Sequence, residues 1–143
     1  MGLSPYSGEG IAPKFGDFEC HRFWMETTLN QEAGLWYANG PHMNMSYWPL
    51  DYPPLCAYTH LGMAHIVNFL VPEALQGKPG FSSPLYRAIM RAALIILELV
   101  ILVPAAVRLL ALLYPKTSAT TRRLLLLLFL CLPPLIFIDH GHF

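Results

Sequence analysis

Four acidic residues stand at the ends of apolar stretches or among aromatic residues, where a carboxylate can do chemistry: Asp17, Glu19, Asp51 and Asp139. A carboxylate in such a place can accept the proton of an attacking hydroxyl group. Transfer of a sugar from an activated phosphate needs only one such base, because the phosphate is already a good leaving group, whereas glycoside hydrolases use a pair of carboxylates. From spacing alone, Asp17 fits two interpretations, a catalytic base and the N-terminal cap of a helix.

Two basic residues follow Asp17 within about one helical turn, His21 and Arg22. The guanidinium group of arginine offers a planar fork of donors that matches phosphate oxygens, so Arg22 is a candidate phosphate ligand. Residues at this spacing also occur on the solvated face of an ordinary surface helix. The sequence leaves both interpretations of Arg22 open.

The remaining histidines offer a weaker signal for a metal site. His140 and His142 lie beside Asp139, but a polar loop at the end of an apolar segment explains this pattern equally well. His60 and His65 do not share one face of a helix. We therefore expect no structural metal site.

The composition indicates a membrane protein. Hydrophobic residues make up 55% of the 143 residues and charged residues only 13%, while the formal net charge is zero. This is too apolar for an ordinary soluble domain of this length. The basic residues lie beside apolar stretches and not on a polar face, which argues against a nucleic-acid surface.

Three apolar stretches predict about three membrane segments, at residues 53–72, 92–113 and 124–138. The second has the roughly 20 residues that a helix needs to cross the hydrocarbon core. The third is short, and Pro133-Pro134 should break its helix. The first contains His60, His65 and Asn68, so we expect it to turn one wetter face toward protein or water.

Residues 1–52 predict a loop that contains a short amphipathic helix and lies outside the membrane. Over residues 17–30, Phe18, Arg22, Met25 and Leu29 recur at helical spacing, with Asp17 at the N-cap position after Gly16. A segment rich in Trp, Tyr and Pro follows, which indicates an ordered loop. Aromatic residues of this kind also favour the membrane interface, so they are not by themselves evidence of a sugar site.

Two further patterns carry less information. Asn44-Met45-Ser46 matches the N-glycosylation sequon and would suit a lumenal loop, although such triplets also arise by chance. Cys20, Cys56 and Cys131 are odd in number and scattered, so they predict neither a disulfide framework nor a zinc site.

Three motifs together resemble a known family. The stretch Gly16-Asp17-Phe18-Glu19-Cys20-His21-Arg22-Phe23-Trp24 is similar to a first lumenal loop with the pattern G-D-Y-E-A-Q-R-H-W. The stretch Trp48-Pro49-Leu50-Asp51-Tyr52-Pro53-Pro54-Leu55 is similar to W-G-L-D-Y-P-P-L, and residues 138–143 match I-D-H-G-H-F. Taken together, these motifs resemble the dolichyl-phosphate-glucose-dependent α-1,3-glucosyltransferase family of the endoplasmic reticulum, and within it the member that adds the first glucose.

The resemblance implies an all-α, multi-span membrane protein of the GT-C type in the endoplasmic-reticulum membrane, with residues 1–52 as a lumenal catalytic loop. It implies inverting transfer of glucose from dolichyl phosphate glucose to the lipid-linked high-mannose oligosaccharide, with an α-1,3 linkage. Asp17 is then the expected catalytic base, and no cofactor, metal or nucleic acid is expected. The residues expected to bind substrate are Glu19, Arg22, Trp24, Asp51, Tyr52, His140 and His142.

The sequence departs from the family pattern at Cys20, His21 and Phe23, where Ala, Gln and His are usual. Family members are also much longer, so we expect an N-terminal fragment that is inactive alone. The alternative hypothesis is a non-catalytic small membrane protein that derives from this family or only resembles it.

Overall fold

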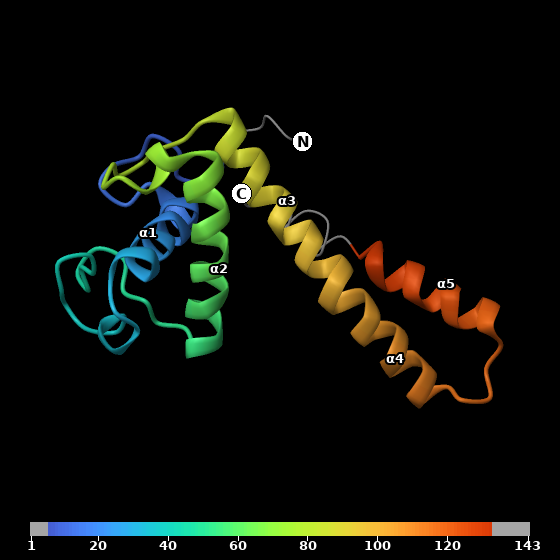
Figure 1. The fold of residues 1–143 in the computed structure, drawn as a ribbon. Coiled ribbons are helices and arrows are strands. Elements are labelled where there is room, and N and C mark those ends of the chain that lie inside the picture. The colour runs from blue at the N-terminus through green and yellow to red at the C-terminus, as the bar shows by residue number, and fades with distance from the viewer. Residues whose placement is uncertain (1–5, 133–143) are drawn as a thin grey trace. The chain divides into compact units, whose positions relative to one another are not determined.

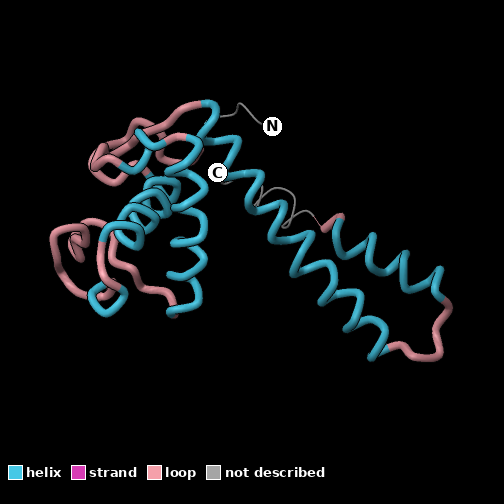
Figure 2. Tube along the Cα trace, viewed as in Figure 1, coloured by secondary structure: helices cyan, strands magenta, loops and turns pink. Residues whose placement is uncertain are grey.

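The computed structural model describes residues 6–132, which form helices joined by loops (Figures 1 and 2). Within these residues the only β pairing is an isolated bridge between Gly40 and Met43. The chain divides into two compact units, an N-terminal unit at Gly2–Ile89 and a C-terminal unit that starts at Met90. The division predicted at residue 52 concerns placement in the membrane and stays a prediction.

Helix α1 (Gly16–Asn30) forms where a short amphipathic helix is predicted, but it is buried on more than one face, because Glu19 and Cys20 are buried beside the residues of the predicted face. Phe18, Arg22 and Met25 are buried, as their spacing predicts. The predicted cap is wrong, because Phe15 occupies the N-cap position and Asp17 lies in the first turn. The helix starts earlier than predicted because Phe15 and Gly16 both adopt left-handed backbone angles, with φ of 57° and 74°, that turn the chain into it.

Helix α2 (Pro54–Leu70) follows the 3₁₀ turn η1 (Ala33–Leu35) and a long loop, and it packs beside α1 (Figure 1). Pro54 stands in its first turn, where the missing N–H costs no helical hydrogen bond. One stripe of α2 is buried, made by Ala57, His60, Ala64 and Val67. The spacing of this stripe is that of a single helix face. The 3₁₀ turn η2 (Pro72–Leu75) ends the segment.

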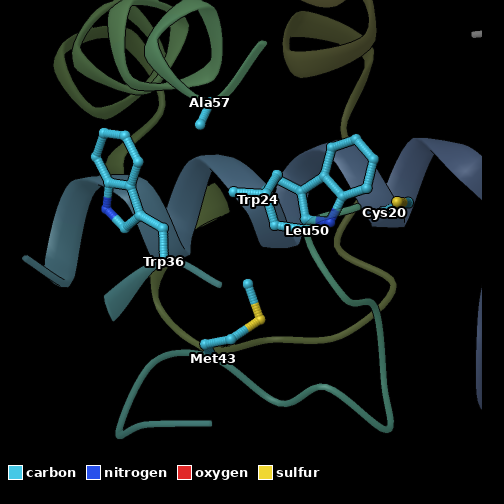
Figure 3. Packing of buried hydrophobic residues seen from close by; sticks show 6 residues of the cluster. All are labelled: Cys20, Trp24, Trp36, Met43, Leu50 and Ala57. Carbon is cyan, nitrogen blue, oxygen red and sulfur yellow. The ribbon is translucent and has the colours of Figure 1, made fainter. Parts of the chain in front are cut away.

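The loop between α1 and α2 closes over an apolar core (Figure 3). Cys20 and Trp24 come from α1, Ala57 comes from α2, and the loop contributes Trp36, Met43 and Leu50. The indole N–H of Trp24 donates to the carbonyl oxygens of Trp48 and Pro49, at 3.3 and 3.1 Å. Because buried indoles require a hydrogen-bond partner, these contacts fix the path of the loop just before Asp51.

Helix α3 (Pro84–Leu97), the π-helical turn η3 (Glu98–Leu102) and α4 (Val103–Leu113) form one continuous helical run of 30 residues. This run is the one helix within residues 6–132 that is long and apolar enough to cross a membrane, and its most apolar stretch is not buried by the protein. It contains the predicted segment 92–113 and begins earlier, at Pro84. The wider π turn directly before Pro104 accommodates a ring that would clash with the carbonyl of an ordinary turn.

Helix α5 (Ala119–Leu130) packs against α4 in the C-terminal unit. It begins at a cap in which the Ser118 side chain accepts from the backbone N–H of Thr121, at 3.1 Å. It is shorter than the roughly 20 residues of a full crossing. The predicted segment 124–138 continues beyond residue 132, outside the described residues.

Candidate active site

Asp17 is exposed at the start of α1. Gly16, which precedes it, has a left-handed φ of 74°, and a Cβ atom there would lie 2.0 Å from the carbonyl oxygen of Ser7. Only glycine fits both requirements, so the Gly-Asp pair of the motif has a structural reason. The first turn of a helix also favours a negative charge, which stabilises the Asp17 carboxylate.

Asp51 is also exposed. The pKa of the Cys20 thiol on α1 is raised by burial and further by the negative charges of Asp17 and Asp51, so both carboxylates lie within electrostatic range of this thiol. Figure 3 shows Cys20 and Trp24 next to Leu50, the residue before Asp51. The fold therefore places two motif acids that lie far apart in the sequence within electrostatic range of one thiol.

Aromatic rings pack around Trp24 on α1, the helix that also carries Asp17. The ring of Trp24 makes edge contacts with Tyr52, His21 and His60, at centroid distances of 5.4, 5.3 and 5.2 Å. Tyr52 is 55% exposed, whereas Trp24 is 3% exposed. The buried ring of Trp24 therefore packs against the ring of Tyr52, which is exposed at the surface.

His21 and His60 form a hydrogen-bonded pair between α1 and α2. Nδ1 of His21 lies 2.8 Å from Nε2 of His60, and Nδ1 of His60 lies 2.8 Å from the carbonyl oxygen of Cys56. Because the Cys56 carbonyl can only accept, His60 carries its proton on Nδ1, and Nε2 of a neutral His60 accepts from His21. This hydrogen bond connects the turn of α1 that follows Asp17 to α2.

Glu19 and Arg22 have a different environment, since each is 1% exposed. Nε and Nη2 of Arg22 donate to the two carboxylate oxygens of Glu19, at 2.7 and 2.8 Å. Nη1 donates to Glu26 at 2.5 Å and to the carbonyl of Ala74 at 2.9 Å. Burial alone lowers the pKa of Arg22, but the Glu19 and Glu26 carboxylates outweigh it and the pKa is raised. Arg22 is therefore permanently charged.

The same carboxylate of Glu19 holds two further segments. It accepts from the hydroxyl of Tyr47 at 3.1 Å and from the backbone N–H of Gly80 at 3.0 Å. Burial raises the pKa of Tyr47, and the charge of Glu19 raises it further. The Glu19–Arg22 pair thus connects α1 to three segments: the loop between α1 and α2, the turn η2, and the loop around Gly80.

The predicted site residues separate into three groups. Asp17, Asp51 and Tyr52 are exposed, whereas Trp24, Glu19 and Arg22 are buried. His140 and His142 lie outside the described residues. Nothing in these positions tests the predicted roles in catalysis or substrate binding, which stay predictions.

Sequence reasoning did not pair His60 with His21. The available signal was the buried stripe of α2, in which His60 is the one polar member among alanine and valine. Within residues 6–132 no group of three His, Cys, Asp or Glu side chains is placed to hold a metal ion.

One helix within residues 6–132 is long and apolar enough to cross a membrane, and the N-terminal unit exposes the motif acids Asp17 and Asp51. The apolar helix is the feature of a membrane protein. The profile of the ALG6, ALG8 glycosyltransferase family matches residues 9–143, and the chain therefore belongs to this family. The family assignment confirms the resemblance found in the three motifs.

Individual relatives carry one name, dolichyl pyrophosphate Man9GlcNAc2 alpha-1,3-glucosyltransferase. The relative from Mus musculus is 41% identical over 100% of this chain, and the relative from Saccharomyces cerevisiae is 37% identical over 100%. A relative from Arabidopsis thaliana, named as a probable enzyme of this type, is 40% identical over 99%. The chain spans 28% of the length of the mouse relative and 27% of the other two.

Proposed function

We propose that this chain provides the Asp17 site of a multi-pass glucosyltransferase in the endoplasmic-reticulum membrane. The enzyme transfers glucose from dolichyl phosphate glucose to a lipid-linked high-mannose oligosaccharide and forms an α-1,3 linkage. Family membership and the names of the relatives, which specify a dolichyl pyrophosphate Man9GlcNAc2 acceptor, support this proposal.

The contrast between Asp17 and Glu19 carries the assignment of the base. Both acids belong to one motif, but Glu19 is 1% exposed and bonded to Arg22, Tyr47 and Gly80. A carboxylate held in this way is not available to a substrate hydroxyl. Asp17 is exposed in the first turn of α1, so it is the motif acid that an acceptor can reach.

In the proposed reaction the acceptor hydroxyl oxygen attacks C1 of the glucose opposite the phosphate. The new C1–O bond forms while the bond from C1 to the phosphate oxygen breaks, so the configuration at C1 inverts. Dolichyl phosphate leaves with the bonding electrons, and the hydroxyl proton passes to the carboxylate of Asp17. The reaction needs no cofactor, because the donor lipid already carries the leaving group.

The neighbouring residues have supporting roles in this scheme. Tyr52 offers an exposed ring against which the apolar face of a sugar can pack, and Trp24 supports that ring from below. Asp51 accepts hydrogen bonds from sugar hydroxyls. Glu19 and Arg22 act as positioning residues, because they fix α1 against the loop that carries Asp51 and Tyr52. His140 and His142 complete the proposed substrate site from the C-terminal motif.

Apolar surfaces support the proposed membrane placement. We propose that the helical run Pro84–Leu113, which is long and apolar enough, spans the bilayer. Helix α2 exposes Leu55 and Phe69, at 79% and 85%, and α5 exposes Leu128 at 67%. Exposed apolar residues of this size indicate contact with lipid or with other membrane helices. We propose that these surfaces hold the dolichol chain and the remaining membrane helices.

Glucose transfer in microsomes that lack the endogenous enzyme tests the proposal. Two proteins are compared, this chain and a chimera in which residues 9–143 replace the matching segment of the yeast relative. We expect the chimera to add glucose to the Man9GlcNAc2 lipid when dolichyl phosphate glucose is supplied, and this chain alone to add none. Absence of transfer by a stably inserted chimera would favour the non-catalytic alternative.

A further inference from the structure

The loop between α1 and α2 contains a polar triplet that the proposed reaction does not use. Asn44, Met45 and Ser46 form an N-x-Ser sequon without proline at the middle or the following position. It is the sole sequon in the sequence, since Asn30, Asn39 and Asn68 are not followed by Ser or Thr two positions later. A match of this length needs structural support before it counts as a site.

The structure supplies that support through exposure. Asn44 and Ser46 are both exposed, whereas the adjacent Met43 is 2% exposed and anchors the loop in the core. A bulky oligosaccharide at Asn44 would therefore extend into solvent without disturbing the apolar cluster. The site also adjoins an open cavity of about 430 Å³, lined in part by Phe23, His42 and Asn44 itself, which leaves room for the first sugar residue.

The local backbone also presents the correct atom. The side-chain oxygen of Asn44 accepts from the backbone N–H of Ser46 at 2.9 Å, and its backbone carbonyl accepts from the N–H of Tyr47 at 3.0 Å. These bonds form an Asx turn on a surface loop. Within residues 6–132 the amide nitrogen of Asn44 has no hydrogen-bond partner. The atom that would receive a sugar is therefore not engaged by the fold.

We propose that Asn44 is an acceptor for N-linked glycosylation. The inference rests on the proposed function and on the lumenal placement of residues 1–52 that the resemblance to the family implies. A membrane oligosaccharyltransferase would supply the sugar from a polyprenyl diphosphate donor. The bond between the Asn44 amide nitrogen and C1 of the sugar forms, the bond from C1 to the diphosphate oxygen breaks, the amide nitrogen loses one proton and the lipid diphosphate leaves.

The test is translation of this chain in the presence of rough microsomes, followed by endoglycosidase digestion and electrophoresis. We expect a mobility shift of one core glycan that digestion removes. Asn44→Gln and Ser46→Ala should each abolish the shift, and Ser46→Thr should retain it. Asn39→Gln, a change of the same type in the same loop but outside a sequon, should also retain it.

A second acceptor in the same unit makes a negative result informative. Glu32→Thr creates a sequon at the exposed Asn30. A glycan on this variant but none on the unmodified chain would show that the loop is lumenal and that Asn44 is not used, which overturns the inference alone. No glycan on either protein would overturn the inference together with the lumenal placement. Because the glycan is read without glucose transfer, a failed catalytic role of Asp17 would leave the inference standing.

Discussion

At the scale of residues, two acids two positions apart have opposite environments. Asp17 is exposed, whereas Glu19 is buried in a pair with Arg22. The motif alone does not distinguish the two acids, and only the fold shows that Asp17 is exposed and Glu19 is buried and paired. The two residues should therefore respond differently to substitution.

Replacing Glu19 by Gln should lower the stability of the N-terminal unit. The change leaves the buried guanidinium of Arg22 with Glu26 as its main charged partner. Removing one partner of a buried ion pair lowers the free energy of unfolding by about 3–5 kcal/mol. Chemical denaturation in detergent micelles measures the loss. Glu32→Gln removes an exposed carboxylate of the same unit and should change the free energy of unfolding by less than about 0.5 kcal/mol. Equal effects of the two changes would contradict the positioning role.

Alkaline pH should destabilise the same unit. Burial and nearby carboxylates raise the pKa values of Cys20 and Tyr47 above the ordinary values of 9.0 and 10.0. The folded state therefore retains these protons where the unfolded state releases them, so stability is complete below about pH 9 and falls as the pH rises further. Unfolding followed across this range should show a shallower decline in the double variant Cys20→Ala/Tyr47→Phe. An unchanged decline would show that these groups do not govern the alkaline limit.

At the scale of elements, the start of α1 and the loop before α2 create the site. The left-handed turn at Phe15 and Gly16 sets the first turn of α1, and the Trp24 indole fixes the loop before Asp51. Neither feature follows from hydrophobic periodicity, which predicted the helix over residues 17–30 but placed its cap at Asp17. Close backbone approach decided the boundary, and it depends on contacts with Ser7 that spacing does not encode.

Gly16→Ala should disrupt this element. The added methyl group would lie 2.0 Å from the Ser7 carbonyl oxygen, and the left-handed backbone costs a residue with a Cβ atom about 1–2 kcal/mol in addition. We expect a lower thermal midpoint and a smaller yield of folded protein. Gly34→Ala is the matched control, because a Cβ atom there meets no atom within 4 Å. A midpoint for Gly16→Ala equal to that of the control would contradict this account of the motif glycine.

At the scale of the whole molecule, sequence and structure agree on two helical segments. The helix over residues 17–30 and the apolar segment ending at Leu113 were both predictable, because each is encoded by local periodicity or length. That Asp17 and Asp51 lie within electrostatic range of the Cys20 thiol was not predictable from spacing, since it depends on the tertiary fold of the N-terminal unit. Resemblance to the family identified both acids without showing how the fold relates them. The number of membrane segments stays a prediction beyond the one apolar run.

The central claim is that Asp17 is the base of a glucosyltransferase, and one substitution tests it most directly. Asp17→Asn is introduced into the chimera with the yeast relative, and glucose transfer to the lipid-linked oligosaccharide is measured at equal protein level beside a Glu32→Gln control. Loss of a general base should reduce the rate about 10²- to 10⁴-fold, with normal insertion and stability because Asp17 is exposed. Transfer by Asp17→Asn at the rate of the control would contradict the account.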